Sequence, residues 1–532
     1  MPVAKIDPKL CNGCGRCVDT CPEDVFRLNL QPIAEELKSP CAMGCPAGVN
    51  VRKYSYYIEM DMMDEAIAGL RKYNPFPAIT GRICPHPCEN KCARNEVDGA
   101  VNINCLERFI ADRYLHEHAS PVRRIYAARV AVIGSGPAGM SCAYYLCEKG
   151  YSVTVFEKEA RPGGMPGVAL PTFRLEQDVV DEQIRFLTEM GVEFRCGVEI
   201  GKDLTIAQLR EQGYESIYLA IGLHSGGKLR IPGDTATGVR PGVDFMKDIR
   251  MRDAAIEGDV VVIGGGMIGA DVARSAKRRG AKSVHLFCLE NYDAMPMGVG
   301  DRTECENEGV VIHAGWGQTE ILESGGHCVG IRFRKCLQVT NAAGRFDPVF
   351  DDAITEEVAC DQVLYCIGQK PAWGSLLDGT SVALTERGFV VADKLTYQTG
   401  EPYIFAGGDV YTGQKFVVDA IGAGRKAAES IDRYLRGVDL KEGRRNDVRV
   451  VYPPKDNIPL LPRQTPACPS CGFSENEARV EAQRCMTCGS RSEIVYPDDC
   501  MVCLYCMRDC PMGAITITPD RISHKIEPWD LG

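Results

Sequence analysis

The chain has 532 residues, of which 45% are hydrophobic and 25% charged, and its formal net charge is −11. This length predicts three or four domains, and the acidic balance without a basic, aromatic-rich patch argues against nucleic-acid binding. The sequence contains no run of about 18 apolar residues, the length needed to cross a membrane, and no apolar signal region precedes the first cysteines. We therefore expect a cytoplasmic protein. The 27 cysteines gather mostly in tight runs towards the two ends, as metal ligands do.

Residues 1–30 contain the first cysteine run. Its spacing, C-x2-C-x2-C-x3-C-P, is that of bacterial [4Fe-4S] ferredoxins, whereas zinc sites usually use two separated CxxC pairs. Short apolar stretches lie before and after the run, so we expect one half of a ferredoxin-like fold here. The cysteines are Cys11, Cys14, Cys17 and Cys21.

Residues 31–125 hold six more cysteines and show no strand-like alternation. An apolar pattern of helical period runs from about Ser55 to Tyr73, so we expect one helix there within a helical domain. Cysteines on both sides of this helix indicate iron–sulfur clusters assembled across space, and buried structural thiols are an acceptable alternative only for the last of them. The six are Cys41, Cys45, Cys84, Cys88, Cys92 and Cys105.

Residues 126–250 open with a dinucleotide-binding fingerprint. The apolar stretch Val130–Ile133 predicts a buried parallel strand, a turn of GxGxxG spacing follows, and a helix leads to a second strand, Val153–Phe156. In such a unit the glycines allow the turn and the approach of a pyrophosphate, and an acid after the second strand binds the ribose. These residues are Gly134, Gly136, Gly139 and Glu157.

Residues 251–365 repeat the fingerprint and are inserted into the first unit. A strand at Val260–Ile263 leads into a second glycine-rich turn, and a strand at Val284–Phe287 follows. Residues 366–440 return to the first unit with Tyr403–Asp409, where glycines and an acid after a strand suit a ribityl or phosphate group. The residues concerned are Gly264, Gly266, Gly269, Gly408 and Asp409.

Residues 441–532 comprise a proline-rich linker and a C-terminal iron–sulfur region. Two CxxC pairs, Cys468–Cys471 and Cys485–Cys488, precede a second full ferredoxin run. Taken in order, these segments predict an α/β protein with two Rossmann-like nucleotide-binding domains, one inserted in the other. A helical iron–sulfur domain would precede them, and a ferredoxin-like half would lie at each terminus. The second run consists of Cys500, Cys503, Cys506 and Cys510.

The sequence resembles the FAD-containing NAD(P)H oxidoreductases typified by the glutamate synthase small subunit and the N-terminal half of dihydropyrimidine dehydrogenase. The resemblance covers about residues 40–437 and rests on TGRICPHPCENKC, VAVIGSGPAG, GVALPTFRL, VVVIGGGMIGADVA and FAGGDV. It implies that the first unit binds FAD and the inserted unit NAD(P)H. By this resemblance FAD would be held by Gly134, Ser135, Gly136, Gly139, Glu157, Gly164, Gly408 and Asp409.

The choice of nicotinamide cofactor follows from one position. NADP-specific relatives carry two arginines just after the second strand of the inserted unit, where Leu289 and Glu290 stand here. A carboxylate there repels a 2′-phosphate and can accept from a free 2′-hydroxyl, so we expect NAD(H), bound by Glu290 and the second glycine-rich turn. The alternative is that Glu290 faces solvent and that Arg278 or Arg279 sets the specificity.

The family also implies ligands for the middle cysteines, with one departure. Relatives place a CxxC within an EAxRC context just upstream of CxxxCP, whereas here that motif comes near the C-terminus. We expect Cys485 and Cys488 to fold back and join Cys41 and Cys92 on one [4Fe-4S] cluster; the alternative is a zinc ribbon of the two C-terminal CxxC pairs. A second cluster would take Cys45, Cys84, Cys88 and, as fourth ligand, Glu107 or Cys105.

The two terminal runs are expected to complete each other. In two-cluster ferredoxins each run gives three cysteines to one cluster and its fourth to the other, and each end of this chain has a single run. We expect one split ferredoxin domain; alternatively each run closes its own cluster, or the halves pair between two subunits. The expected sets are Cys11, Cys14, Cys17 and Cys510, and Cys500, Cys503, Cys506 and Cys21.

These parts predict an electron-transfer enzyme with FAD, NAD(H) and four [4Fe-4S] clusters. A nicotinamide gives up two electrons, a cluster takes one at a time, and a flavin does both. We expect a subunit that links NADH to a partner oxidoreductase; alternatives are a stand-alone NAD(P)H:ferredoxin oxidoreductase, a glutamate synthase-like small subunit, and a scaffold with empty nucleotide sites. No CxxC lies between residues 106 and 467, which argues against a disulfide reductase.

Overall fold

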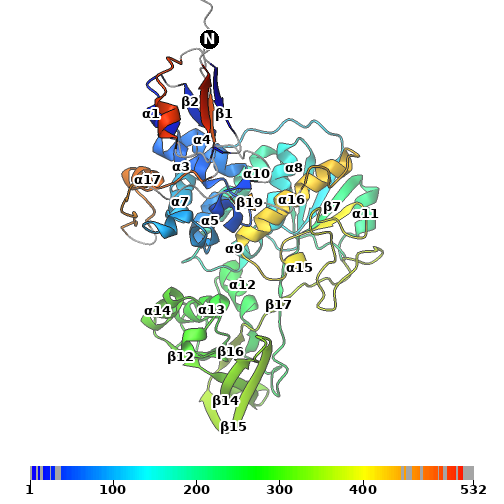
Figure 1. The fold of residues 1–532 in the computed structure, drawn as a ribbon. Coiled ribbons are helices and arrows are strands. Elements are labelled where there is room, and N and C mark those ends of the chain that lie inside the picture. The colour runs from blue at the N-terminus through cyan, green and yellow to red at the C-terminus, as the bar shows by residue number, and fades with distance from the viewer. Residues whose placement is uncertain are drawn as a thin grey trace, which may run out of the picture. The chain divides into compact units, whose positions relative to one another are not determined.

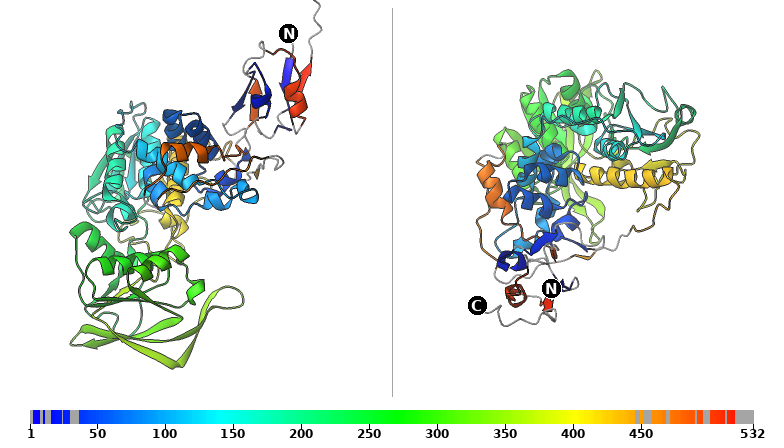
Figure 2. Two further views of the ribbon diagram at one scale, coloured as in Figure 1. Left: turned by 90° about the vertical axis from the view of Figure 1, so that its left-hand side faces the viewer. Right: turned by 90° about the horizontal axis from the view of Figure 1, so that it is seen from above.

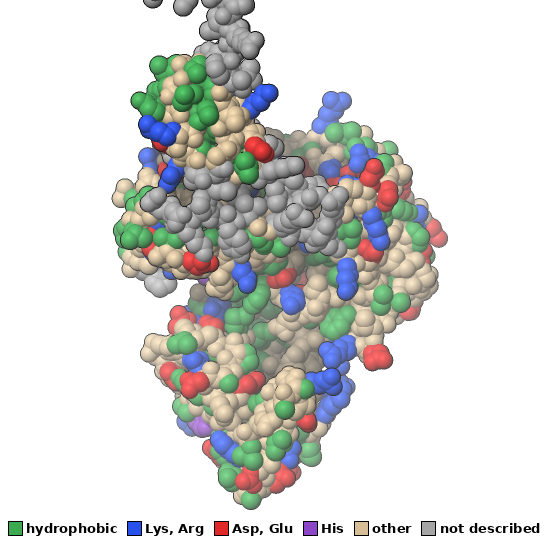
Figure 3. Space-filling view, in the orientation of Figure 1, with side chains coloured by type: hydrophobic (Ala, Val, Ile, Leu, Met, Phe, Trp, Pro, Cys, Tyr) green, Lys and Arg blue, Asp and Glu red, His purple; other side chains and the backbone are tan. Residues whose placement is uncertain are grey.

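The computed structural model describes residues 3–7, 10–11, 16–23, 25–29, 37–444, 449–450, 458–467, 471–488, 491–494, 500–510 and 513–518. The chain divides into two compact units (Figure 1). The first comprises Met1–Glu117, Phe416–Arg425 and Asp439–Gly532, and the second His118–Lys415 and Lys426–Val438. None of the described helices has the length and hydropathy of a membrane span. On the face drawn in Figure 3, acidic and basic side chains are interspersed.

The second unit contains a parallel five-stranded sheet built on the first fingerprint, with strand order β18-β7-β4-β5-β6. Helix α8 (Pro137–Glu148) follows the glycine-rich turn and packs on β4 and β5, beside α10 (Gln177–Met190). Nearly every residue of β4 and β5 is buried, as expected for strands covered on both faces. The strands are β4 (Arg129–Ile133), β5 (Ser152–Glu157), β6 (Glu193–Cys196), β7 (Tyr214–Leu219) and β18 (Ile404–Ala406). The shorter and later helices are α9 (Gly164–Val168), α11 (Ile206–Glu211), α15 (Asp409–Thr412) and α16 (Val417–Leu435).

A second parallel sheet, in the order β12-β11-β10-β16-β9, is built on the second fingerprint. The sequence led us to expect this domain to begin at residue 251. Strand β9, however, also pairs within the sheet, so the sheet begins before that residue. A short antiparallel pair, β8 (Ser225–Gly226) with β17 (Gln369–Lys370), lies on the two connections between the sheets. The strands are β9 (Val239–Pro241), β10 (Asp259–Ile263), β11 (Ser283–Cys288), β12 (Val310–Ala314) and β16 (Gln362–Tyr365). The helices are α12 (Gly242–Arg252), α13 (Met267–Arg278), η2 (Tyr292–Ala294) and α14 (Val299–Asn307).

An antiparallel three-stranded sheet, which the sequence did not lead us to expect, joins β12 to β16. It consists of β13 (Trp316–Ser324), β14 (His327–Thr340) and β15 (Phe346–Ala359). Its inner face packs on the second parallel sheet, where the rings of Phe333 and Phe287 stack with centroids 3.9 Å apart. Helices α12 to α14 contribute to a separate core on the β10 and β11 side chains that point the other way.

The helical part of the first unit corrects one expectation. The single helix from Ser55 to Tyr73 is two helices, α3 (Val51–Glu59) and α4 (Met63–Arg71). Asp61 adopts a left-handed φ of 59° between them, so the chain reverses while the apolar pattern continues. The remaining elements are β3 (Leu37–Lys38), α2 (Pro40–Gly44), α5 (Pro77–Ile83), α6 (Pro87–Asn90), η1 (Ala93–Glu96), α7 (Ile103–Arg113), β19 (Arg449–Val450) and α17 (Glu475–Ala482).

The two ends of the chain fold together within one chain. Strand β1 (Val3–Ile6) pairs antiparallel with β21 (Ile515–Thr518), and β2 (Phe26–Asn29) pairs antiparallel with β20 (Arg491–Ile494). Helices α1 (Arg16–Thr20) and α18 (Tyr505–Asp509) pack on each other. Figure 2 shows these N-terminal and C-terminal elements, blue and red, alternating in one small body. Ala4, Phe26, Ile515 and Ile517 share its core.

Candidate functional site

The first glycine-rich turn uses its glycines in the way a dinucleotide requires. Gly134 has φ +101°, and a Cβ on it would lie 2.5 Å from the carbonyl oxygen of Ala220. A Cβ on Gly139 would collide with the carbonyl oxygen of Gly134. Gly136, at the N-terminus of α8, has no atom closer than 3.9 Å to such a Cβ, so the space in front of the helix is open. This is the space that a pyrophosphate takes in such units.

Glu157 is buried at the end of β5 and is held against this turn. One carboxylate oxygen accepts from Ser135, both from the backbone N–H at 3.0 Å and from the hydroxyl at 2.6 Å. The other oxygen accepts from the backbone N–H of Glu159 at 2.9 Å. The loop that follows crosses the turn, since Gly163 donates to Ser135 Oγ and a Cβ on Gly164 would collide with the Cα of Gly136. The carboxylate is therefore positioned before any ligand arrives.

Gly408 and Asp409 lie at the same edge of the same sheet. Strand β18 ends at Ala406 beside β7, and Gly407 donates to the carbonyl of Leu219. Gly408 has φ +69° and precedes α15, which begins at Asp409. Because the carboxyl ends of parallel strands meet at one edge, the structure places these residues on the side of the sheet that carries the first turn.

The second glycine-rich turn repeats the geometry with a different acid. A Cβ on Gly264 would lie 2.6 Å from the carbonyl oxygen of Cys366, whereas Gly266 has open space around it, and a Cβ on Gly269 would collide with the carbonyl oxygen of Gly264. By strand register, Cys288 occupies the position in this sheet that Glu157 takes in the sheet of the first glycine-rich turn. Glu290, two residues on, reaches back so that its Oε2 lies 3.3 Å from where a Cβ on Gly265 would stand.

The two arginines that could have set cofactor specificity are engaged elsewhere. Arg278 donates to Glu308 with Nε at 2.8 Å and Nη2 at 2.7 Å, and Arg279 forms an ion pair with Asp253. Glu290 is therefore the charged group that the structure sets against the second turn, and it is only partly exposed.

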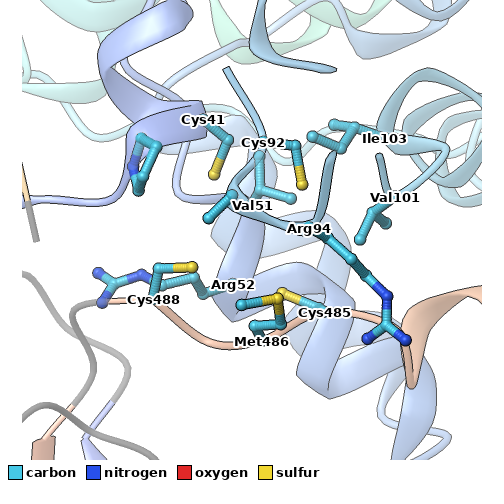
Figure 4. A pocket seen from close by; sticks show the side chains of 12 residues that line it. Cys41, Val51, Arg52, Cys92, Arg94, Val101, Ile103, Cys485, Met486 and Cys488 are labelled. Carbon is cyan, nitrogen blue, oxygen red and sulfur yellow. The ribbon is translucent and has the colours of Figure 1, made fainter. Parts of the chain in front are cut away.

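Four cysteines from three distant segments line one cavity, and we call them the first cysteine group (Figure 4). Cys41 lies in α2, Cys92 follows α6, and Cys485 and Cys488 follow α17. Burial raises the pKa of Cys41 to about 11 and that of Cys485 to about 12, with the neighbouring thiols adding to the shift. Buried thiols with raised pKa values need a positively charged group to hold them as thiolates, and an iron–sulfur cluster meets this requirement.

Three further cysteines form the second cysteine group, with Glu107 beside them. Cys45 and Cys84 directly follow α2 and α5, and Cys88 lies within α6. Burial raises the pKa of all three thiols, and the Glu107 carboxylate adds to the shift. Glu107 is buried, accepts from Asn74 Nδ2 at 3.0 Å and from the Thr80 hydroxyl, and burial raises its pKa to about 7. The thiol of Cys41 also contributes to the raised pKa of Cys88, so the first and second cysteine groups lie next to each other.

Cys105 lies apart from this group. It shares α7 with Glu107, but two residues on a helix differ by about 200° in direction. Burial raises the pKa of Cys105, and the side chains that modify this shift include those of Glu89, Asn102, Arg463 and Arg108, none of which belongs to the second group.

The C-terminal segment is docked on the helical domain by an ion-pair network that sequence reasoning did not identify. Arg484 has no exposed side-chain surface; it donates to Glu481 Oε1 at 2.8 Å and to Asp98 Oδ1 at 2.9 Å. It also donates to the backbone carbonyls of Leu461, Asp98, Gly99 and Ala100. Glu481 accepts from the backbone N–H of Asn102 at 2.6 Å. The Glu and Arg of the EAxRC motif were the sequence signal that could have indicated this docking network, but their partners in the helical domain are distant in sequence.

The terminal cysteines lie in the shared core of the two chain ends. Cys17, Cys21, Cys500, Cys506 and Cys510 all belong to it. Burial raises the pKa of Cys506 to about 11, and Cys21 is the strongest charged influence on it, ahead of Cys503 and Cys500. Cys11 is partly exposed. Cys14 and Cys468 lie outside the described residues.

Family models match most of the chain. One described as pyridine nucleotide-disulphide oxidoreductase matches residues 128–424. One described as dihydropyrimidine dehydrogenase domain II, 4Fe-4S cluster, matches residues 35–119, and a 4Fe-4S binding domain matches residues 3–26. These matches cover both glycine-rich turns, the cysteines from Cys41 to Cys105 and the N-terminal run.

Known proteins extend the similarity to nearly the whole chain. The β subunit of the NADP(+)-dependent formate dehydrogenase of Moorella thermoacetica is 32% identical over 500 residues, which is 85% of this chain and 70% of that protein. The PreT subunit of the NAD-dependent dihydropyrimidine dehydrogenase of Escherichia coli K12 is 32% identical over 406 residues, 75% of this chain and 92% of that one. The structure of Mycobacterium tuberculosis FprA with NADPH shares the fold, with a TM-score of 0.50 at 15% identity, over 62% of this chain and 88% of that chain.

Proposed function

The chain belongs to the family of pyridine nucleotide-disulphide oxidoreductases and carries [4Fe-4S] domains of the dihydropyrimidine dehydrogenase type, and from this premise we propose that it carries electrons between NADH and a partner oxidoreductase. It is an NAD(P)H-dependent oxidoreductase with flavin and iron–sulfur domains. The observation that carries the proposal is the convergence of four cysteines from three segments on one cavity, in a chain that also has two open glycine-rich turns.

The residues around the first glycine-rich turn, in the second unit, are proposed to bind FAD. The open space at Gly136 would take the pyrophosphate, with Gly164 crossing above it, and Glu157 would accept from the ribose. Gly408 and Asp409 would meet the ribityl and phosphate part. When bound, FAD supplies the conversion between the two-electron chemistry of a nicotinamide and the one-electron chemistry of a cluster.

Four clusters are proposed along the first unit. The first cysteine group would bind one, and the second group with Glu107 another. Residues 1–30 and the C-terminal run would form a split ferredoxin domain with two more, a reading that the β1–β21 and β2–β20 pairs support. Cys21 would join the cluster of the C-terminal run and Cys510 that of the N-terminal run, as the runs of two-cluster ferredoxins exchange their fourth cysteines; the core that these cysteines share supports this pairing of the runs.

A partner oxidoreductase is inferred from the relatives and from the number of proposed clusters. The formate dehydrogenase β subunit and PreT are each named as subunits of larger enzymes. In addition, four clusters are more than an enzyme needs in order to reduce a free ferredoxin. Copurification from the native source tests this. A stoichiometric oxidoreductase partner supports the subunit reading, and isolation as a single chain that reduces ferredoxin supports the stand-alone alternative.

We predict that NADH is preferred over NADPH. The Glu290 carboxylate lies against Gly265, where it would repel a 2′-phosphate. Glu290→Ala should reduce the preference by about tenfold, equivalent to ~1.4 kcal/mol, whereas Glu323→Ala, an exposed carboxylate on β13 of the same unit, should leave it unchanged. The measurement is kcat/KM for each cofactor with an artificial acceptor. A higher kcat/KM for NADPH in the unaltered protein would show the assignment to be wrong.

We predict that Glu107, and not Cys105, completes the second cysteine group. Glu107→Ala should remove or alter the EPR signal of one cluster, because the carboxylate acts on all three thiols of that group. Cys105→Ser, the matched variant two residues away on α7, should retain every signal and the full iron content. The opposite pattern, with the signal lost in Cys105→Ser and retained in Glu107→Ala, would assign the position to the cysteine.

A further inference from the structure

Among the described residues that line the cavity of the first cysteine group there are two cationic side chains and no acidic one. Around the four cysteines the lining is apolar except for Arg52 and Arg94. The apolar residues are Pro40, Val51, Ala93, Val101, Ile103 and Met486. A charge in such a lining acts on its neighbours with little screening by water.

The two arginines are placed differently. Arg94 turns its guanidinium away from the sulfurs and forms a two-point ion pair with Asp98, with Nε at 2.6 Å and Nη2 at 2.7 Å from the carboxylate oxygens. Arg52 is the second residue of α3 and only 4% exposed, and its side chain runs beside Cys488 (Figure 4). Burial lowers the pKa of Arg52, and the groups that oppose this shift include the thiols of Cys41, Cys485 and Cys488.

The second cysteine group has the opposite surroundings. Glu107 acts on Cys45, Cys84 and Cys88, and Asp419 acts on Cys84 as well. The nearest charged side chains therefore differ in sign between the two adjoining groups: the buried guanidinium of Arg52 at the first, and the carboxylates of the buried Glu107 and the half-buried Asp419 at the second.

We propose that Arg52 raises the reduction potential of the cluster bound by Cys41, Cys92, Cys485 and Cys488 above that of its neighbour, and so sets the order in which the two clusters are reduced. This inference rests on the proposed function, in which both groups bind [4Fe-4S] clusters. Each reduction adds one electron and no bond changes, so the reduced form carries one more negative charge than the oxidised form. A buried cation stabilises that form, and a buried carboxylate destabilises it.

The consequence is a preferred direction for the step between the two clusters. One electron leaves the cluster beside Glu107, which is oxidised, and enters the cluster beside Arg52, which is reduced. Because Cys485 and Cys488 come from the C-terminal segment, the electron passes to the cluster that is completed by that segment.

The test is a redox titration of the full-length protein, followed by EPR, with three variants. Arg52→Met removes the charge, Arg52→Lys keeps it, and Lys53→Met removes a neighbouring charge that lies over the ring of Tyr57 instead of lining the cavity. Arg52→Met should shift the midpoint potential of one cluster to a more negative value and leave the others in place. Arg52→Lys should recover most of the shift, and Lys53→Met should produce none.

Two outcomes would overturn the inference: a cluster present in Arg52→Met with an unshifted potential, or an equal shift of all clusters. If Arg52→Met does not assemble this cluster, Arg52→Gln and Arg52→Lys are compared, and equal potentials in these two would equally overturn it. Absence of any cluster signal in the unaltered protein would instead defeat the proposed function, so the two failures are distinguishable.

Discussion

Deletion of residues 1–30 is expected to remove about eight iron atoms per chain, two clusters' worth, although only one cysteine run is deleted. The deletion removes β1 and β2, which are the pairing partners of the C-terminal strands β21 and β20. It also removes Ala4, Val25 and Phe26 from the core that the two chain ends share. Cys21, which shares this core with Cys506, is removed as well. The C-terminal run would be left without its fourth ligand and without its packing partner.

Iron analysis and EPR of the truncated protein provide the measurement. Loss of only about four iron atoms, with the C-terminal cluster intact, would show that the two runs are independent. Point variants separate ligand loss from loss of packing. Cys21→Ser should alter the cluster of the C-terminal run, and Cys510→Ser that of the N-terminal run. If each serine altered the cluster of its own run, the exchange of ligands would be refuted.

Replacement of Arg484 by Met is expected to release the C-terminal segment from the helical domain. The guanidinium is fully buried, and its loss leaves Glu481, which is also fully buried, without its cationic partner. Removing one member of a buried pair costs about 3–5 kcal/mol. The segment that carries Cys485 and Cys488 would then detach, and the first cysteine group would lose two of its four sulfurs.

The expected result is a loss of about four iron atoms and new protease cleavage between residues 459 and 488. Arg479→Met is the matched control, because Arg479 lies shortly before Arg484, on α17, and forms exposed ion pairs with Glu475 and Asp61. Such pairs contribute about 0–1 kcal/mol, so this variant should keep its iron. Stoichiometric zinc in the anaerobically purified protein would support the zinc ribbon and contradict the account.

The nucleotide-binding strands and turns could be predicted from the sequence because their signals are local. The buried run Val130–Ile133 and the glycines after it lie within eleven residues, and the structure places a strand and a turn there. The second fingerprint followed for the same reason. In the second fingerprint, Cys288 stands at the position that matches Glu157, and the acid, Glu290, comes two residues later. Only the folded chain shows that its carboxylate still reaches the glycine-rich turn.

Other features depended on contacts that a single sequence does not reveal. The strands β13 to β15 carry many charged residues and alternate irregularly, since bulges interrupt their pairing. The helix break at Asp61 is a backbone conformation without a glycine or proline to mark it. The approach of Cys485 and Cys488 to Cys41 was expected by resemblance, but the means of docking, through Arg484 and Asp98, joins residues 386 positions apart.

Rapid mixing with excess NADH under anaerobic conditions tests most directly whether one chain carries electrons from NADH through a flavin to its clusters. Flavin absorbance is followed by stopped flow and the clusters by freeze-quench EPR. The account predicts that the flavin is bleached first and that signals of reduced [4Fe-4S] clusters follow in the same protein without any added mediator. A fully bleached flavin with every cluster still EPR-silent, or a purified protein without flavin, would contradict it.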